Sequence, residues 1–200
     1  MENKKHRTNL RKRVIVSALA GIVGMAAVSV NSIQVEAIGK DFEHIQYLYT
    51  KYSEVSEESV IEMSWNEYLH LLRMTMAESG YCSEEMMNGC ASAAINQCIQ
   101  NDYAMEDTLN RPGAFGNGIH EFRDSKGVWR EVELSDVNST VVDAVNDALL
   151  GNDVTSEIGG AIGFFAPNET TEETVKYFYD HISSGETMQI ENVVFFSEWK

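Results

Sequence analysis

Basic residues, cysteines and repeated segments are all scarce in this sequence, and each scarcity argues against a class of partner, bond or architecture. The 200 residues include 15 Lys and Arg against 31 Asp and Glu, so the formal net charge at neutral pH is −16. A surface this acidic repels nucleic acid and anionic lipid, and we expect neither as a partner, whereas a neutral or zwitterionic polymer is acceptable. No internal repeat or low-complexity tract occurs, and 44% hydrophobic residues suffice for a core, so the sequence predicts a globular protein.

Cysteine and histidine patterns argue against disulfide and metal chemistry. The cysteines are three, Cys82, Cys90 and Cys98, so they cannot all pair with one another. If Cys90 and Cys98 share a helix, their separation is about 12 Å of rise, too far for a disulfide. A bridge between Cys82 and Cys90 is conceivable, but small buried apolar residues are the favoured interpretation. No CxxC and no paired histidine spacing occurs, so we expect no metal and no cofactor.

The N-terminus has the order of segments typical of a secretory signal peptide. Basic residues open the chain, an uncharged apolar run covers 14–30, and Val35-Glu36-Ala37 provides a small-residue exit. We predict cleavage after Ala37 and a secreted, extracytoplasmic protein. Without residues 1–37 the net charge becomes −20, from 9 basic and 29 acidic residues. The alternative is an uncleaved N-terminal anchor, although the run is somewhat short for a membrane span.

The remainder divides into a spacer and one domain. Residues 38–62 are polar and Glu-rich with an aromatic cluster, and predict a spacer with a helical patch. Residues 63–200 form the predicted catalytic domain. Its first helix is expected over 64–80, because Ser64-x-x-Glu67 is a capping-box pattern, apolar residues recur at helical spacing, and Gly80 supplies a stop.

Further along, the hydrophobic period changes from helical to extended. Helices are predicted over 83–100, 136–150 and 171–182, and a loop over 110–127. Residues 161–165 and 193–196 are short apolar runs that predict antiparallel strands. The predicted fold class is therefore α+β and mostly α, a helical body with a small antiparallel β-sheet.

Glu78 raises a question, because it stands where the helix predicted over 64–80 runs out. An acidic side chain is unfavourable at the negative end of a helix, and a solvated surface residue is the simplest interpretation. A Glu at a helix end, backed by a second helix and facing a small sheet across a groove, is however the arrangement of lysozyme-like folds. There, apolar surroundings and negative potential raise the carboxyl pKa until the acid can protonate a glycosidic oxygen. Met74 and Met76 could supply the apolar wall.

A series of motifs from Leu71 to Phe196 occurs in the order found in one family. It comprises Arg73-Met74-Thr75-Met76-Ala77-Glu78, Glu85, Asn96, Arg111-Pro112-Gly113-Ala114-Phe115, Trp129, Ala144 to Thr155, Gly160 to Pro167, and Ile190 to Phe196. The chain thereby resembles the cell-wall hydrolase family of the spore cortex-lytic enzymes SleB and CwlJ. The departures are Gly163 and Ala166, where the family has Tyr and Asn, and Glu191 and Val193, where it has Gly and His. In the family these positions lie toward the groove.

The resemblance implies a lysozyme-like enzyme that cleaves peptidoglycan glycan strands as a lytic transglycosylase or muramidase. Glu78 would act as acid and then as base, so a second close carboxylate is not obligatory. Glu85 would be a supporting acid, or an ordinary first-turn Glu. The implied substrate-binding residues are Asn96, Phe115, Trp129, Phe164 and Phe165, although Asn96 could equally be a buried amide bonding backbone. We expect a monomer whose partner is the glycan strand, with no membrane contact beyond the signal segment.

Two other classes of function stay open. Substituted strand motifs could leave a catalytically weakened domain that only binds peptidoglycan. An N-acetylmuramoyl-L-alanine amidase would instead cut the sugar-peptide bond, a reaction that usually requires zinc or a Cys/His pair.

Overall fold

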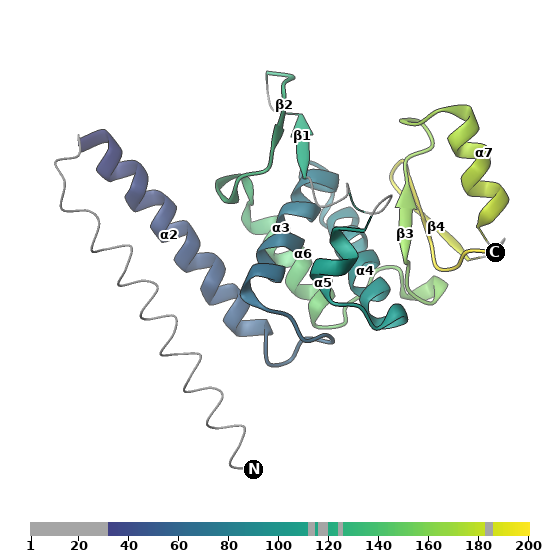
Figure 1. The fold of residues 1–200 in the computed structure, drawn as a ribbon, viewed down its shortest axis with the longest axis horizontal. Coiled ribbons are helices and arrows are strands. Elements are labelled where there is room, and N and C mark those ends of the chain that lie inside the picture. Colours follow the sequence, from purple (N-terminus) through teal and green to yellow (C-terminus); the bar gives the residue numbers. More distant parts are fainter. Residues whose placement is uncertain (1–31, 112–114, 116–119, 124–125, 183–185) are drawn as a thin grey trace, which may run out of the picture. The chain divides into compact units, whose positions relative to one another are not determined.

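The computed structural model describes residues 32–111, 115, 120–123, 126–182 and 186–200 (Figure 1). The chain divides into two units, Met1–Glu43 and His44–Lys200. Helix α2 (Ser32–Val55) begins in the first unit and ends in the second. The predicted signal peptide lies outside the described residues up to residue 31, and the predicted cleavage point after Ala37 falls within α2. Across the described ranges, no helix combines the length and apolar character needed to cross a membrane.

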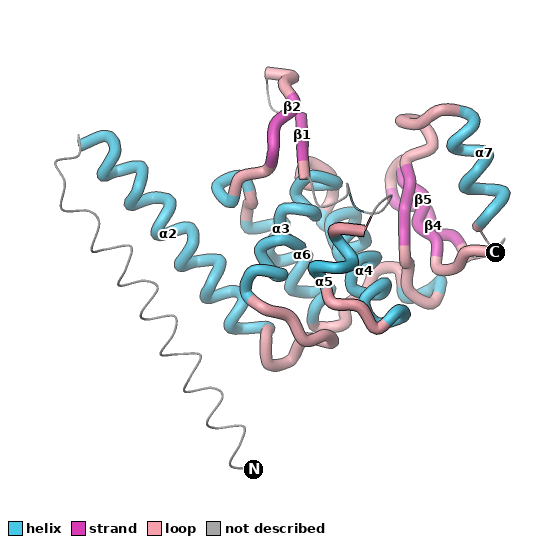
Figure 2. The backbone as a smooth tube through the Cα atoms, viewed as in Figure 1, coloured by secondary structure: helices cyan, strands magenta, loops and turns pink. Residues whose placement is uncertain are grey.

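The second unit is a helical body with two small antiparallel sheets, which confirms the α+β, mostly α prediction (Figure 2). Its body consists of α3 (Trp65–Ser79), α4 (Glu84–Asn101), α5 (Met105–Leu109) and α6 (Ser139–Leu149). Short 3₁₀ turns occupy Leu134–Asp136 and Ser156–Ile158. Three of these four helices were predicted, and the short α5 was not.

The start of α3 is set by the capping box. Ser64 accepts from the backbone N–H of Glu67, and the Glu67 carboxylate accepts from the backbone N–H of Ser64 at 2.7 Å. The helix ends at Gly80, whose N–H bonds to the carbonyl of Met76. Gly80 is right-handed (φ −60°), so glycine is needed here for close approach and not for a left-handed turn. A Cβ at Gly80 would lie 2.3 Å from the Met76 sulfur.

Small residues of α4 allow neighbouring elements to approach it closely. α4 packs against α3, α5 and α6, and its inner face carries Ala91, Ala93 and Ala94, all fully buried. Gly89 faces the sheet, where an added Cβ would lie 2.8 Å from the ring of Phe195. Close packing of this kind is what brings the end of α3 and the sheet to opposite sides of one pocket.

The C-terminal half of α2 differs from the spacer expected over 38–62. Leu48 and Val55 are buried, and Tyr52 packs against Trp65 and Tyr68 with ring centroids 5.5 and 5.3 Å apart. Apolar residues at positions 48, 52 and 55 recur at helical spacing and therefore cover the core on one face. Residues from 44 onward belong to the second unit, whereas the predicted domain begins at residue 63.

The three-stranded sheet has the order β3-β5-β4, all antiparallel. Strands β3 (Gly163–Phe165) and β5 (Val193–Phe196) pair as predicted, with Phe164 opposite Phe195. Strand β4 (Thr187–Ile190) was not predicted. Helix α7 (Glu172–His181) covers one face of the sheet, where Phe178 stacks on Phe165 at 4.4 Å, and α4 covers the other.

A second sheet, a two-stranded hairpin, interrupts the loop predicted over 110–127. It pairs β1 (Glu121–Arg123) with β2 (Trp129–Glu131), and projects from the helical body (Figure 1). Phe122 is its buried residue, and the Arg130 guanidinium lies 4.5 Å above the Phe122 ring. Neither strand exceeds three residues, which is too short for periodicity to reveal.

Candidate functional site

A cavity of about 200 Å³ lies in the second unit and brings together the end of α3, the C-terminal part of α4 and the sheet. Its lining consists of Glu78, Gln97, Arg111, Phe115, Ile162, Gly163, Phe164, Phe178, Phe196 and Trp199. Three residues that the sequence assigned to the site, Glu78, Phe115 and Phe164, are among them. Gln97 and Trp199 were missed, because nothing in their sequence neighbourhood distinguishes them from ordinary polar or surface residues. Arg111 begins the motif that ends at Phe115, but only Phe115 of that motif was assigned to the site.

Glu78 belongs to the last turn of α3, next to the carbonyls that end the helix. The Glu78 side chain is exposed to solvent at the pocket, and the protein atoms around its carboxyl group partly desolvate it and so raise its pKa. Within the described part of the chain, no hydrogen-bond donor satisfies the Glu78 carboxylate. Desolvation without a compensating donor favours the neutral acid, which is the form able to give up a proton.

The apolar wall is aromatic and not the one expected. Met74 and Met76 lie in the core, and neither belongs to the lining of the pocket. Instead, the ring of Phe115 lies 6.0 Å from that of Phe164, and Trp199 lies 4.7 Å from Phe196. Helix position alone could not show this, because both methionines point from α3 to the interior.

Phe115 adopts a backbone conformation that is unusual for its type. Its φ is +42°, in the left-handed region, while its ring is 9% exposed and packs on the core. A non-glycine residue held there costs about 1–3 kcal/mol and persists only where the surroundings enforce it. The strain places the Phe115 ring at the pocket wall.

Arg111 follows α5 and is held by Gln97 of α4. Its Nη2 donates to the Gln97 Oε1 at 2.7 Å, and the Gln97 amide donates in turn to the carbonyl of Ile162. Gln97 is buried. A chain of hydrogen bonds therefore joins the loop after α5, α4 and the approach to β3 around one side of the pocket.

Four other predicted site residues lie outside the pocket lining. Glu85 is exposed in the first turn of α4, as an ordinary first-turn Glu would be. Asn96 donates to Asp153 Oδ2 at 2.9 Å and to the carbonyl of Ala161 at 3.0 Å, which is the structural alternative. Trp129 is 65% exposed on β2, and Phe165 is buried against α7.

Of the four departures from the family motifs, only Gly163 lines the pocket, so the expectation that all four lie toward the groove is corrected. Val193 is buried in the core, because alternate residues of β5 face α4 and α7, and Ala166 packs beside it half-buried. Glu191 has a left-handed φ of +53°, where glycine would be unstrained. Its carboxylate accepts from the N–H of Ser83 at 2.9 Å and so ties the β4–β5 turn to the start of α4.

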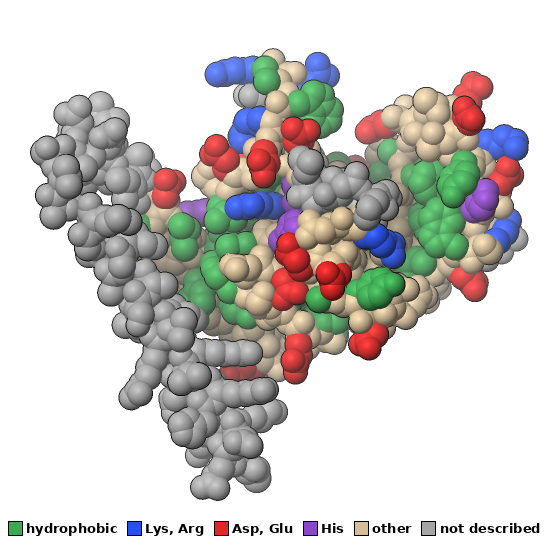
Figure 3. All heavy atoms as spheres, viewed as in Figure 1, with side chains coloured by type: hydrophobic (Ala, Val, Ile, Leu, Met, Phe, Trp, Pro, Cys, Tyr) green, Lys and Arg blue, Asp and Glu red, His purple; other side chains and the backbone are tan. Residues whose placement is uncertain are grey.

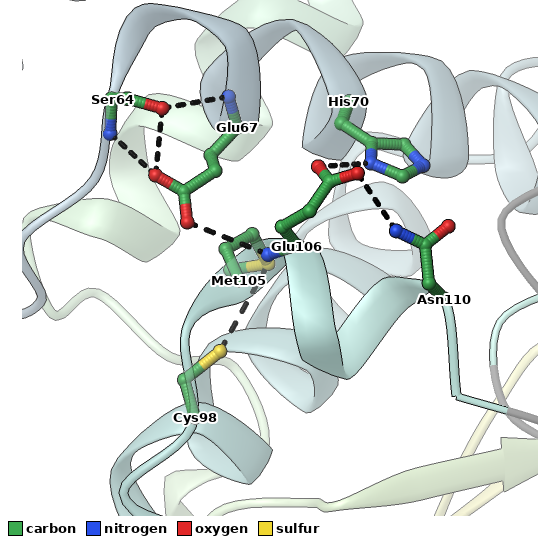
Figure 4. Close-up of polar contacts among 7 residues, drawn as sticks. All are labelled: Ser64, Glu67, His70, Cys98, Met105, Glu106 and Asn110. Atoms are coloured by element: carbon green, nitrogen blue, oxygen red, sulfur yellow. Dashed lines mark hydrogen bonds and ion pairs between the residues drawn. The ribbon is translucent and has the colours of Figure 1, made fainter.

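A histidine pair lies near α5, apart from the residues that line the pocket. His70 Nδ1 is 3.0 Å from Glu106 Oε2, and Asn110 donates to Glu106 Oε1 at 2.7 Å (Figure 4). The ring of His120 lies 4.7 Å from that of His70 and is 4% exposed. Neither of its nitrogens has a partner within the described residues. Burial, aided by the nearby His70 and Arg73 charges, lowers the pKa of His120 to about 4.

The three cysteines are free. Cys90 and Cys98 are buried in α4, as predicted for small apolar residues, whereas Cys82 is exposed, contrary to that prediction, because it lies in the turn between α3 and α4. Over the described ranges, no group of three or more His, Cys, Asp or Glu side chains is placed to hold a metal ion.

Comparison of the chain with protein-family models, curated proteins and solved structures found no match. A functional assignment therefore depends on the pocket. Its arrangement offers one carboxyl group with a raised pKa, one arginine held by a buried amide, and a wall of aromatic rings. Such a set can bind a molecule with apolar faces and transfer one proton to it.

Proposed function

We propose that this protein cleaves the glycan strands of peptidoglycan, with Glu78 as the proton donor. The observation that carries the proposal is the place of the Glu78 carboxyl, which ends α3 exposed in a pocket walled by aromatic rings and whose pKa is raised by partial desolvation there. General acid catalysis needs a carboxyl that is still protonated near the working pH. Partial desolvation shifts the pKa of Glu78 in the direction that this requirement needs, and the negative end of the helix acts in the same direction.

The proposed reaction uses one carboxyl group twice. Glu78 donates its proton to the glycosidic oxygen as the bond from that oxygen to the sugar carbon breaks. The carboxylate then accepts a proton from a hydroxyl of the same sugar, whose oxygen closes an anhydro ring on that carbon. Water in place of the hydroxyl would give the muramidase outcome. Among the described residues, Glu78 is the only carboxylate of the lining, which supports a single-acid mechanism over one with paired carboxylates.

Aromatic rings suit a saccharide because the C–H faces of sugars are apolar. Trp199 is 41% exposed at the pocket and Tyr177 is 54% exposed next to it, with ring centroids 6.5 Å apart. In Figure 3 hydrophobic side chains gather at the surface beside α7 and the C-terminus. These rings would accept sugar units flanking the bond that is cut.

The lysozyme-like architecture and the membership of the cortex-lytic family belong to the same proposal. Support comes from the order of α3, α4 and the β3-β5-β4 sheet around Glu78, which is what the motif series implies. Export through the predicted signal peptide would bring the enzyme to its substrate outside the cytoplasmic membrane.

Digestion of purified peptidoglycan, followed by mass spectrometry, tests the proposal. Wild-type protein should release fragments with anhydromuramic ends, or with reducing ends for a muramidase, and Glu78→Gln should release neither. Glu85→Gln is the matched control, because it makes the same change at an exposed position seven residues along. Free peptides would identify an amidase, and binding without any product would identify a glycan-binding domain; either result contradicts the proposal.

A further inference from the structure

Arg111 brings a positive charge into the pocket that contains Glu78. Its guanidinium lines the cavity and is half-buried. The protein carries 31 acidic side chains, so carboxylates that could pair with a cation are abundant in this chain. The described residues nevertheless give it only a neutral partner, the amide oxygen of Gln97.

Gln97 holds the guanidinium in one orientation. Because the Gln97 amide nitrogen donates to the carbonyl of Ile162, its oxygen must face Arg111. Gln97 is 6% exposed, so packing restricts its rotamer as well. The buried amide of Gln97 thus positions Arg111. The guanidinium N–H groups that do not bond to Gln97 can donate to a ligand in the pocket.

Arg130 shows the contrasting, structural use of arginine in this chain. Its two terminal nitrogens donate to both oxygens of Asp136, at 2.7 and 2.5 Å. There the carboxylate compensates the charge. Arg111, by contrast, has no ion pair with any residue that the structure describes, and its described partner is the uncharged Gln97.

Glu78 is not the missing partner. Both side chains line the cavity, yet no ion pair or hydrogen bond joins them in the part of the chain that the structure describes, where Arg111 donates to Gln97. Acid and cation therefore serve different ends of one ligand. A ligand that fits both has a neutral oxygen to be protonated and an anionic group elsewhere.

We propose that Arg111 binds a carboxylate of the substrate and so makes the pocket selective for acidic glycan strands over neutral ones. The inference rests on the proposed function, because it takes the Glu78 pocket to be a glycan site. Planar guanidinium groups recognise carboxylates through paired hydrogen bonds. In peptidoglycan the carboxylate has two sources: the lactyl group of a muramic acid that lacks its peptide, and the peptide itself.

Isothermal titration in the Glu78→Gln background separates binding from turnover. The probes are a chitin oligosaccharide, which is neutral, peptide-free peptidoglycan strands, which expose lactyl carboxylates, and peptide-bearing strands. We expect at least one acidic probe to bind more tightly than chitin. Arg111→Gln should lower that ratio of affinities by about tenfold to a hundredfold, the range for a charge-assisted hydrogen bond. Which acidic probe loses affinity identifies the source of the carboxylate.

Three further variants guard against a structural explanation. Arg111→Lys keeps the charge without the planar fork and should restore part of the ratio. Gln97→Glu leaves Arg111 in place but offers it an internal carboxylate, and should lower the ratio as Arg111→Gln does. Lys176→Gln removes one positive charge from the exposed face of α7 and should leave the ratio within twofold of the parent.

The results also separate this inference from the proposed function. If Arg111→Gln loses affinity for neutral and acidic probes equally, Arg111 is a purely structural residue and the inference is overturned. The inference is also overturned if Arg111→Gln binds chitin and acidic strands as tightly as its parent does. Cleavage of glycan by the wild type would then still stand. If no glycosidic bond is cleaved but the Arg111-dependent ratio is found, the proposed reaction fails and the acidic-glycan site remains.

Discussion

The Phe196 ring lies directly over Gly163: a Cβ built at position 163 would be 2.4 Å from Phe196 Cζ. The two residues face each other in the β3–β5 pairing, and both line the pocket. The absence of a side chain at 163 is therefore what allows the Phe196 ring to form part of the wall. A tyrosine at 163, as in the family motif, cannot coexist with this position of the ring.

Gly163→Ala should lower the free energy of unfolding by about 1–3 kcal/mol, the usual cost of overpacking. Chemical denaturation measures the change. When Gly163→Ala is combined with Phe196→Leu, the added methyl group meets a smaller side chain. The double variant should therefore lose less free energy of unfolding than the sum of the losses in the two single variants. Strict additivity would mean that the contact does not limit position 163.

Glu78→Gln should lower turnover on purified glycan strands by about 10²–10⁴, the contribution of a general acid. Stability should hold or rise, because the amide cannot ionise at the negative end of the helix. The wild-type rate should fall as pH rises through the raised pKa of Glu78, since the protonated form is the active one. Glu85→Gln, on the exposed start of α4, should retain most of the activity. A folded Glu78→Gln protein with nearly full turnover would remove Glu78 from the mechanism.

The raised pKa of Glu78 also makes the free energy of unfolding depend on pH. Between the unfolded-state value of 4.5 and the higher folded value, the folded protein holds more protons, so stability falls as pH rises through this window. Glu78→Gln abolishes that loss. Denaturation at several pH values, with and without the substitution, should show the two curves diverging as pH increases.

His120 should make the protein less stable in mild acid. Its pKa of about 4 in the folded protein lies below the unfolded value of 6.5. As pH falls through this interval, the unfolded chain binds a proton at His120 that the folded protein does not bind, so the unfolded state becomes relatively more stable. We expect a loss of about 2 kcal/mol, taking 1.4 kcal/mol per pKa unit and allowing for partial screening. Above pH 6.5 the loss is absent.

Replacing His120 by Phe should remove this part of the pH dependence. Urea denaturation between pH 6.5 and 5 measures it, with both proteins carrying Glu78→Gln so that the raised pKa of Glu78 adds no titration of its own; the pKa of Glu106, which pairs with His70, is lowered by that contact. Equal slopes in the wild type and the variant would show that His120 already carries its proton in the folded state.

The cysteines should matter for packing and not for chemistry. Cys90 is fully buried and burial raises the pKa of its thiol, so it is a poor nucleophile. Cys90→Ala should cost about 1–2 kcal/mol of stability and leave cleavage intact. Cys82→Ala, at the exposed turn, should change stability by less than about 0.5 kcal/mol. Loss of all turnover in folded Cys90→Ala would indicate thiol catalysis and contradict the single-acid mechanism.

The local features of this fold could be predicted from the sequence, because they depend on residues close together in the chain. The capping box of Ser64 and Glu67 predicted where α3 begins, and Gly80 where it ends. Apolar runs predicted β3 and β5, and the position of Glu78 at a helix end followed from the same pattern. Strands β1, β2 and β4 were not predicted, since their short runs are not continuously apolar and have no distinct period. The packed end of α2 was not predicted either, because its burial depends on partners elsewhere in the chain.

The composition of the pocket was decided by tertiary structure. Gln97, Arg111 and Trp199 are far apart in sequence from Glu78, and only the packing of α4 against α3 and of the sheet against α4 brings them to one cavity. The same packing directs Met74 and Met76 inward and leaves Asn96 bonding backbone. That packing determines which charges lie near an acid and how much water reaches it. The sequence could therefore predict that Glu78 is a candidate, but only the folded chain raises its pKa and places a cation in its pocket.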